Sequence, residues 1–319
     1  MNRKILTLGF AVLALATACV LHNRQTRDDS RTFRWPSMGT IAQVTVRGNL
    51  AHEDDLIARV RDSYTHLESR LSAWDPTSEL SRLAADGCTN WLSAASPDVR
   101  PCYAAALRLA RESKNAFNPA VGRTLRTLGI GRRGTYASFD LGAIAKGFAV
   151  DFAAKQIASG PSESLLLDLG GNLRVLGDRP WRTGIRNPFS CRDASQPAFC
   201  AVVVLTNGES VATSGNYERF IEKDGKRLSH ILDGRTGEPT HGIAGVTVIT
   251  PSAYGATLAD GLSTTLFVLG PDEGATFLAT YYPQALALWI PDTPSSPRLI
   301  ATQAMARRLE QATAPIETR

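Results

Sequence analysis

Two residues in the stretch ADGLST, at 259–264, have the chemistry and the spacing to bind a cation. Asp260 and Thr264 are four positions apart, so in a helix both side chains project from one face. A carboxylate and a hydroxyl brought together in this way supply the oxygen ligands that Mg²⁺ prefers. Helix capping or an ordinary polar helix face would give the same pattern, so the stretch alone leaves the choice open.

The stretch DLGAIAKG, at 140–147, predicts a tight turn that leads into a helix. Asp140 is expected to end a strand, Gly142 to permit the turn, and Lys146 to lie in the first helical turn. Free backbone N–H groups and a lysine charge at this point favour a phosphate. The spacings GxxxxGK[ST] and GxGxxG are both absent. An ordinary strand–turn–helix junction is the alternative.

Two ring-bearing residues next to predicted turns are further candidates. His230, in LSHILDGRTG, could act as a general base near neutral pH, or could be a hydrogen-bonded hairpin histidine. Trp74, in LSAWDPTSEL, could stack on a flat ring, or could fill the core beneath a helix.

The hydrophobic periodicity predicts an α+β fold with mostly antiparallel sheets and packed helices. One helix is supported by apolar residues at helical spacing: Leu56, Val60, Tyr64, Leu67 and Leu71. The expected helices are 52–72, 97–114, a helix that follows Gly142, a helix from near Ser252 to 270, and 272–280. The expected strands are 39–48, 164–177, 201–208, 242–250 and 284–290.

The composition is that of a globular protein, with 319 residues, 43% hydrophobic residues and 20% charged residues. This length suits one large domain or two fused ones. The formal net charge is +5, without a long run of one sign. A modest excess of this kind is more often a solvated surface, so nucleic-acid binding is not indicated.

The N-terminus predicts export. A basic start (Asn2, Arg3, Lys4) precedes the apolar segment 5–16, which is too short to span a bilayer comfortably. The small residues of ATAC resemble a bacterial lipoprotein cleavage site that ends at Cys19. We therefore expect a signal peptide at 1–18, a lipidated Cys19 and a polar tether at 19–32. The expected location is the periplasmic face of the bacterial inner membrane, with a soluble periplasmic protein as the alternative.

Four further cysteines suggest disulfides, because an even number is typical of proteins in an oxidising compartment. They are Cys88, Cys102, Cys191 and Cys200. Three pairings are possible. The favoured one, Cys88–Cys102 with Cys191–Cys200, closes two short loops.

From about Phe33 to Leu299 the chain resembles the ApbE family of FAD:protein FMN transferases. The resemblance rests on motifs that follow one another in the family's order: SMGT (37–40), LSAWDPTSELSRL (71–83), AFNPAVG (116–122), DLGAIAKGFAVD (140–151), LLDLGGNLRVLG (166–177), GIRNP (184–188), VATSGNYERF (211–220), SHILDGRTGEP (229–239) and VTVITPSAYGATLADGLSTTLFVLG (246–270).

The resemblance implies an ApbE-like (tunnelling-fold-like) catalytic domain at 33–300, followed by a polar tail at 301–319. It also implies a reaction. With Mg²⁺, a Thr or Ser hydroxyl of an acceptor protein attacks the pyrophosphate of FAD, FMN remains on the acceptor as a phosphoester, and AMP leaves. The family's acceptors are secreted or membrane-exposed flavoproteins, such as subunits of ion-pumping or extracytoplasmic redox complexes.

The resemblance also assigns roles to individual residues. Mg²⁺ is held by the carbonyl of Ala143 and by the side chains of Asp260 and Thr264, and His230 assists deprotonation of the acceptor hydroxyl. Asn118 stands where the family commonly has Asp, and Ser263 stands where some members have an acid. The residues expected at FAD are Met38, Trp74, Ala116, Phe117, Asn118, Asp140, Lys146 and Ile231.

Two other functions remain compatible with the same residues. Water could replace the acceptor hydroxyl, which would make the protein an FAD pyrophosphatase that releases FMN and AMP. Alternatively, the protein could be a flavin-binding lipoprotein without catalytic activity.

Overall fold

The computed structural model describes the chain from Asp29 onward. The predicted signal peptide, Cys19 and most of the predicted tether lie outside the described residues, as do Cys88 and Cys191. The described ranges are 29–50, 52–85, 89–128, 138–157, 163–190, 193, 195–216, 220–223 and 226–319.

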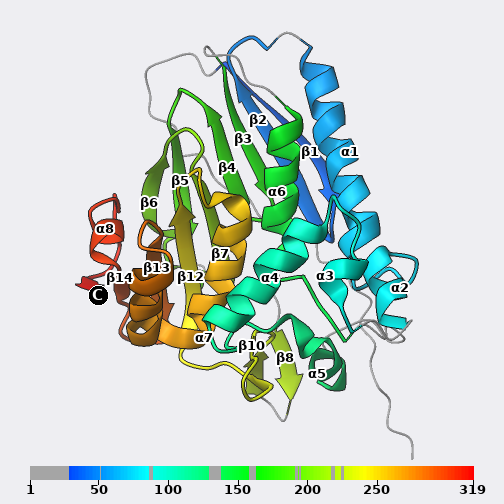
Figure 1. Ribbon diagram of the computed structural model, residues 1–319. Coiled ribbons are helices and arrows are strands. Elements are labelled where there is room, and N and C mark those ends of the chain that lie inside the picture. The colour runs from blue at the N-terminus through cyan, green and yellow to red at the C-terminus, as the bar shows by residue number, and fades with distance from the viewer. Residues whose placement is uncertain are drawn as a thin grey trace, which may run out of the picture.

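A nine-stranded sheet forms the centre of the molecule (Figure 1). Its strand order is β1-β2-β3-β4-β7-β12-β13-β14-β15, and all neighbouring pairs are antiparallel except β14 and β15. This confirms the predicted α+β class with mostly antiparallel pairing. The strands are β1 (Ser30–Ser37), β2 (Thr40–Arg47), β3 (Ser164–Leu169), β4 (Asn172–Gly177), β7 (Ser210–Gly215), β12 (Ile243–Thr250), β13 (Leu286–Pro291), β14 (Leu299–Ala301) and β15 (Ile316–Thr318).

Helices cover one face of this sheet. In Figure 1, α1, α4, α6 and α7 lie in front of the strands, and their apolar residues form one core with β2, β3 and β12. The five apolar residues that predicted the first helix are all buried. The helices are α1 (Glu53–Leu71), α2 (Glu79–Ala85), α3 (Trp91–Ala94), α4 (Arg100–Glu112), the 3₁₀ turn η1 (Pro119–Val121), α5 (Gly122–Thr127), α6 (Ala145–Gln156), α7 (Gly255–Tyr281) and α8 (Gln303–Ala306).

A second core lies on the other face, where the hairpin of β5 (Trp181–Arg186) and β6 (Phe199–Leu205) packs on the sheet. Both faces of the central strands are therefore covered, and every residue of β3 and of β12 is buried. The sequences of strands that are buried on both faces are mostly apolar, without the alternation of apolar and polar residues seen in half-exposed strands. Two small hairpins, β8–β9 (Phe220–Lys223, Lys226–Ser229) and β10–β11 (Leu232–Asp233, Glu238–Pro239), complete the fold.

Several predicted elements differ from the structure in detail. The expected strand 164–177 is a hairpin, because Gly170 and Gly171 take positive φ angles of 60° and 84° and turn the chain between β3 and β4. Asp140 does not end a strand but lies in the irregular segment before α6. The two helices expected to meet near 270 are the halves of α7, which is interrupted at Gly270 (φ 71°) and Pro271.

The C-terminal residues 301–319 do not form the polar tail expected from the sequence. They include α8, whose Met305 is fully buried in the second core, and β15, which pairs with β14 at the sheet edge. These residues are therefore part of the folded structure. At its other end, β1 begins at Ser30, inside the expected tether.

The favoured disulfide pairing is not found. Cys102 and Cys200, which were each expected to pair, are buried free thiols. Cys102 lies on α4 within the helical core, and Cys200 lies on β6 within the second core. Burial raises the pKa of the Cys200 thiol to about 12. In the part of the chain that the structure describes, we find no helix that is long and apolar enough to cross a membrane.

Candidate active site

Asp260 lies at the interface between α6 and α7, with only 5% of its surface exposed. Its Oδ2 accepts a hydrogen bond of 2.9 Å from the backbone N–H of Gly147 on α6. The helices approach closely at this point, since a Cβ on Gly147 would lie 2.1 Å from the carbonyl oxygen of Ala256 and 2.7 Å from the Cβ of Asp260. Only glycine fits here without displacing the backbone of α7.

Lys146 connects this carboxylate to the turn before α6. Its Nζ lies 3.7 Å from Asp260 Oδ2 and donates a hydrogen bond of 3.2 Å to the carbonyl of Gly142. The turn is itself fixed by Asp140, whose Oδ1 accepts a hydrogen bond of 2.6 Å from the N–H of Gly142. The structure thus brings Asp140, Lys146 and the turn that carries Ala143 to one side of Asp260.

The hydroxyl of Thr264 lies one helical turn beyond Asp260, as the spacing predicted. It is 3.1 Å from the hydroxyl of Ser214 on β7. Ser214 also contacts Ser263 Oγ at 2.7 Å, and Ser263 donates a hydrogen bond of 2.8 Å to the backbone carbonyl of Asp260. Ser263 is completely buried. Its hydroxyl therefore helps to attach α7 to the sheet.

This donor set fits a hard cation such as Mg²⁺. It combines a buried carboxylate, a hydroxyl and the carbonyls of a tight turn, and all of these are oxygen ligands. Among the described residues, no group of three or more His, Cys, Asp and Glu side chains gathers in a way that could hold a metal. An ion at Asp260 would therefore rely on hydroxyl and carbonyl oxygens, phosphate oxygens of a substrate, or water.

Asp151, which the sequence reasoning missed, fixes the start of α7. Its carboxylate accepts hydrogen bonds from the N–H groups of Ala256 (2.9 Å) and Thr257 (2.8 Å) and from the Thr257 hydroxyl (2.6 Å). Arg174 on β4 pairs with it at 2.6 Å. A carboxylate at a helix N-terminus stabilises the unpaired N–H groups there. The signal was present in the sequence, because Asp151 follows Gly147 by four residues and so shares its helix face.

A second group of predicted site residues surrounds the turn between β10 and β11. The N–H of Gly234 donates to the carbonyl of Ala116 at 3.1 Å, and the side-chain amide of Asn118 donates to the carbonyl of Gly234 at 3.3 Å. The turn sits tightly on this segment, since a Cβ on Gly234 would lie 2.3 Å from the Cβ of Asn118. Asn118 Oδ1 also accepts from the N–H of Ala120 and begins η1.

His230 and Ile231 lead into this same turn, and Phe117 is buried beside it. His230 is half-buried, and Ile231 is buried with its carbonyl bonded to Thr240. The N–H of Asp140 donates a hydrogen bond of 2.7 Å to the carbonyl of Pro119, directly after Asn118. This bond joins the second group to the Asp140–Lys146–Asp260 group.

Met38 and Trp74 lie at the C-terminal end of α1 and form a third group. Met38 is in the β1–β2 turn with a φ of 47°, and its N–H donates to Glu68 Oε2 on α1 at 3.1 Å. Trp74 follows α1 and is 48% exposed. This exposure contradicts the alternative that Trp74 fills the core.

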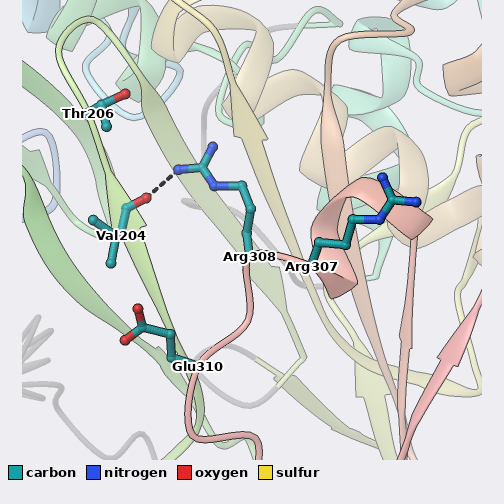
Figure 2. A pocket seen from close by; sticks show the side chains of 5 residues that line it. All are labelled: Val204, Thr206, Arg307, Arg308 and Glu310. Carbon is teal, nitrogen blue, oxygen red and sulfur yellow. Dashed lines mark hydrogen bonds between the residues drawn. The ribbon is translucent and has the colours of Figure 1, made fainter.

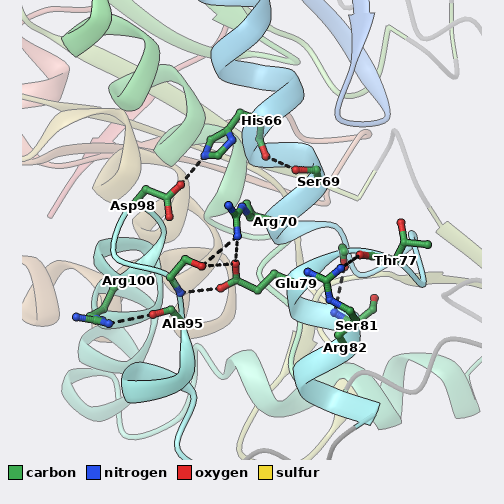
Figure 3. Close-up of polar contacts among 12 residues, drawn as sticks. His66, Ser69, Arg70, Thr77, Glu79, Ser81, Arg82, Ala95, Asp98 and Arg100 are labelled. Carbon is green, nitrogen blue, oxygen red and sulfur yellow. Dashed lines mark hydrogen bonds and ion pairs between the residues drawn. The ribbon is translucent and has the colours of Figure 1, made fainter.

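A polar cluster holds the loop that carries Trp74 (Figure 3). Arg70 on α1 donates to Glu79 on α2 at 2.7 Å, and Glu79 accepts hydrogen bonds from the N–H and the hydroxyl of Ser96. Nearby, His66 on α1 contacts the carboxylate of Asp98. Burial alone would raise the pKa of Glu79, but the hydrogen bonds from Ser96 and Arg70 outweigh it and hold this pKa below 4.5.

One surface pocket lies away from these groups (Figure 2). It has a volume of about 440 Å³ and is lined by Val204, Thr206, Arg307, Arg308 and Glu310. Arg308 is bound to Glu209 at 2.5 Å and to the carbonyl of Val204. None of the residues predicted to bind flavin or metal lines it, so it has no part in the proposed chemistry.

A protein-family model matches most of the length of the chain and identifies its family. The model of the ApbE family matches residues 38–138 and 130–289. The chain belongs to the ApbE family. The matched ranges contain all the predicted site residues, from Met38 to Thr264.

Curated relatives of this ApbE chain are named FAD:protein FMN transferase. The protein from Haemophilus influenzae is 26% identical over 85% of this chain and 89% of its own length. The protein from Rhodobacter capsulatus is 38% identical, over 54% of this chain. In that second case the match spans only 31% of the relative's own length.

Solved structures of ApbE proteins share the fold. A protein from Thermotoga maritima superimposes with a TM-score of 0.75 at 23% identity, over 88% of this chain and all of the other. The flavin transferase ApbE from Vibrio cholerae gives 0.73 at 23% identity, over 89% of this chain and all of the other. The apo form of the flavinyl transferase ApbE from Pseudomonas stutzeri gives 0.70 at 25% identity, over 88% and 97% of the chains. The α+β architecture predicted from the sequence is thus the ApbE architecture.

Proposed function

We propose that this protein is an FAD:protein FMN transferase. It moves FMN from FAD to a Thr or Ser hydroxyl of an acceptor flavoprotein and releases AMP. The observation that carries the proposal is the buried Asp260, which faces Lys146 and lies one helical turn before the Thr264 hydroxyl in an ApbE-family chain. The name that the curated relatives carry supports the same activity.

The proposed metal is Mg²⁺, held by Asp260, Thr264 and the backbone carbonyl of Ala143. When bound, the ion neutralises the charge of the pyrophosphate and of the departing phosphate oxygen. Asp260 suits this role because its Oδ2 is already satisfied by Gly147, while no hydrogen bond from the described residues reaches Oδ1. Thr264 suits it because its hydroxyl projects from the same helix face.

FAD is proposed to bind across the three groups of residues. Lys146 supplies a point charge for phosphate oxygens next to the turn that Asp140 fixes. The exposed ring of Trp74 suits stacking on an adenine or flavin ring. The remaining residues proposed at FAD are Met38, Ala116, Phe117, Asn118 and Ile231.

The transfer step exchanges one P–O bond for another. The acceptor hydroxyl oxygen attacks the phosphorus of the FMN half of FAD, and the bond from that phosphorus to the bridging oxygen breaks. The bridging oxygen leaves with AMP. His230 takes the proton of the hydroxyl, since a neutral imidazole can accept a proton near pH 7.

Export, lipid attachment at Cys19 and a position on the periplasmic face of the inner membrane are proposed from the N-terminal sequence alone. An acceptor would then be an extracytoplasmic flavoprotein, such as a subunit of a redox or ion-pumping complex. An export test with a reporter fused after residue 32, with Cys19→Ser as control, would examine both points.

The activity is tested by incubating the purified protein with FAD, Mg²⁺ and a candidate acceptor domain while AMP and protein-bound flavin are measured. AMP together with flavin on the acceptor is the expected result. AMP with free FMN alone would show an FAD pyrophosphatase instead. Flavin retention without AMP would show a flavin-binding protein and would overturn the proposal.

A further inference from the structure

Three hydroxyl groups form a short chain that connects the proposed metal site to the central sheet. Ser214 on β7 contacts both Ser263 (2.7 Å) and Thr264 (3.1 Å) on α7. Ser263 donates in turn to the backbone carbonyl of Asp260 at 2.8 Å. Ser214 is fixed in the sheet, where it pairs with Val246 of β12. This hydrogen-bond network therefore connects a strand of the sheet to the hydroxyl of Thr264 and to the backbone of Asp260.

The directions of these hydrogen bonds follow from counting protons. A carbonyl oxygen only accepts, and each hydroxyl has one proton to donate. The hydroxyl proton of Ser263 is donated to the Asp260 carbonyl, so Ser214 must be the donor in the contact between Ser263 and Ser214. Ser214 then has no second proton to donate. In the remaining contact, Thr264 must donate its proton to Ser214.

The consequence concerns the free lone pairs of Thr264. A hydroxyl binds a cation through an oxygen lone pair, and a proton turned toward the ion would repel it. With its proton held by Ser214, Thr264 directs its lone pairs away from β7. In metal sites, partners that orient a ligand in this way tune the affinity of the site.

We propose that Ser214 is a positioning residue for the cation site, and that the Ser214–Ser263 pair fixes the hydroxyl of Thr264 in its ligating orientation. Neither Ser214 nor Ser263 binds the ion itself. The inference rests on the proposed function, because it takes Asp260 and Thr264 as ligands. It also gives Ser263 a role. Some family members have an acid at this position, whereas here the Ser263 hydroxyl donates its hydrogen bond to the backbone carbonyl of Asp260.

The test measures cation affinity directly, with Mn²⁺ as a paramagnetic substitute for Mg²⁺ and with FAD present but no acceptor. Free Mn²⁺ is followed by electron paramagnetic resonance, and Mg²⁺ is added in competition. For Ser214→Ala, the dissociation constant for Mn²⁺ should rise by about 10-fold to 100-fold. Ser214→Thr keeps a hydroxyl and should restore most of the affinity.

Ser263→Ala tests the direction of the hydrogen bonds among the three hydroxyl groups. It leaves Ser214 and Thr264 in place but frees the Ser214 proton, which can then point at Thr264. The affinity should fall although Ser263 does not bind the ion and acts on Thr264 only through Ser214. A merely structural serine would not produce this effect together with rescue by Ser214→Thr.

Thr213→Val is the matched control. Thr213 neighbours Ser214 on β7, and its hydroxyl pairs with Thr247 at 2.9 Å on the opposite face of the sheet. It should lower the melting temperature without changing the Mn²⁺ affinity. If Ser214→Ala changes the affinity no more than Thr213→Val does, the positioning role is wrong.

Asp260→Ala separates this inference from the proposed function. If Asp260→Ala abolishes Mn²⁺ binding while Ser214→Ala leaves it intact, only the positioning role fails. If Asp260→Ala binds Mn²⁺ as the unaltered protein does, or the unaltered protein binds none beyond what FAD alone binds, the metal site itself is wrong and the inference fails with it.

Discussion

Gly147 and Asp260 meet across the interface of α6 and α7, where the glycine N–H donates to the buried carboxylate at 2.9 Å. The contact makes the position of the carboxylate depend on how closely the two helices approach. The residue beside Gly147, Lys146, reaches the same carboxylate with its ammonium group. One dipeptide on α6 therefore determines both the place and the electrostatic surroundings of the proposed metal ligand.

We predict that Gly147→Ala destabilises the protein by about 1–3 kcal/mol, as overpacking of a tight contact does. The new Cβ would lie 2.1 Å from the carbonyl oxygen of Ala256, so α7 must move and Asp260 must move with it. Urea unfolding and Mn²⁺ affinity should both change. Gly245→Ala is the control, because a Cβ there meets its nearest neighbour at an ordinary 3.6 Å. Equal behaviour of the two variants would contradict the prediction.

We predict that Asp260→Ala reduces transfer more than His230→Ala does. A general base contributes about 10²-fold to 10⁴-fold, and that factor is the expected loss for His230→Ala. Asp260→Ala removes the charged ligand of the ion and should reduce the rate further. The measurement is AMP release at saturating FAD and acceptor. An Asp260→Ala variant that retained most of its Mg²⁺-dependent activity would overturn the assigned role.

Asn118 provides a third prediction. Its amide donates to the carbonyl of Gly234, which an ionised carboxylate at the same place could not do. Asn118→Asp should therefore weaken the docking of the β10–β11 turn and destabilise the protein by about 1–3 kcal/mol at neutral pH. The affinity for FAD, followed by flavin fluorescence, should fall in parallel. Unchanged stability and FAD affinity would show that the amide bond is unimportant.

Residues on α7 and β7 show how much of the candidate site could be predicted from the sequence. The spacing of Asp260 and Thr264 was enough to place both on one helix face, because helical periodicity is local. Ser214 was not identified, because its contact with Ser263 joins β7 to α7 across 49 residues and depends on how the sheet packs. Met305 and β15 were missed for a similar reason: a polar sequence can complete a sheet edge when its few apolar residues have a place in the core.

The stability of the loop that carries Trp74 should depend on pH through Glu79. Its folded pKa lies below 4.5, although burial alone would raise it, because Ser96 and Arg70 stabilise the carboxylate. A depressed folded pKa gives stability that is present above the ordinary pKa and is lost as pH falls through the folded value. We expect Glu79→Gln to be less stable than the unaltered protein at pH 7, by about 1–3 kcal/mol.

The difference in unfolding free energy between these two proteins should narrow as the pH falls from the ordinary carboxyl pKa through the lower folded pKa of Glu79, because the unaltered carboxyl becomes protonated in the folded state over that range. Thermal unfolding between pH 3 and pH 7 measures it. Glu53→Gln is a suitable control, since its partner Arg31 lies at the exposed start of β1. A difference that stayed constant across this pH range would show that the charge of Glu79 is not what stabilises the cluster.

The two buried thiols lead to the last prediction. Burial raises the pKa of Cys102 well above its ordinary range, and the charge of Asp260 raises it further. The pKa of Cys200 is raised to about 12, so neither residue carries a reactive thiolate at pH 8. Iodoacetamide should therefore leave both unmodified in the folded protein and modify both in urea, as followed by peptide mass spectrometry without prior reduction. Resistance to alkylation in urea would show that they are held in disulfides, and rapid reaction in the folded state would show that the two cores open readily.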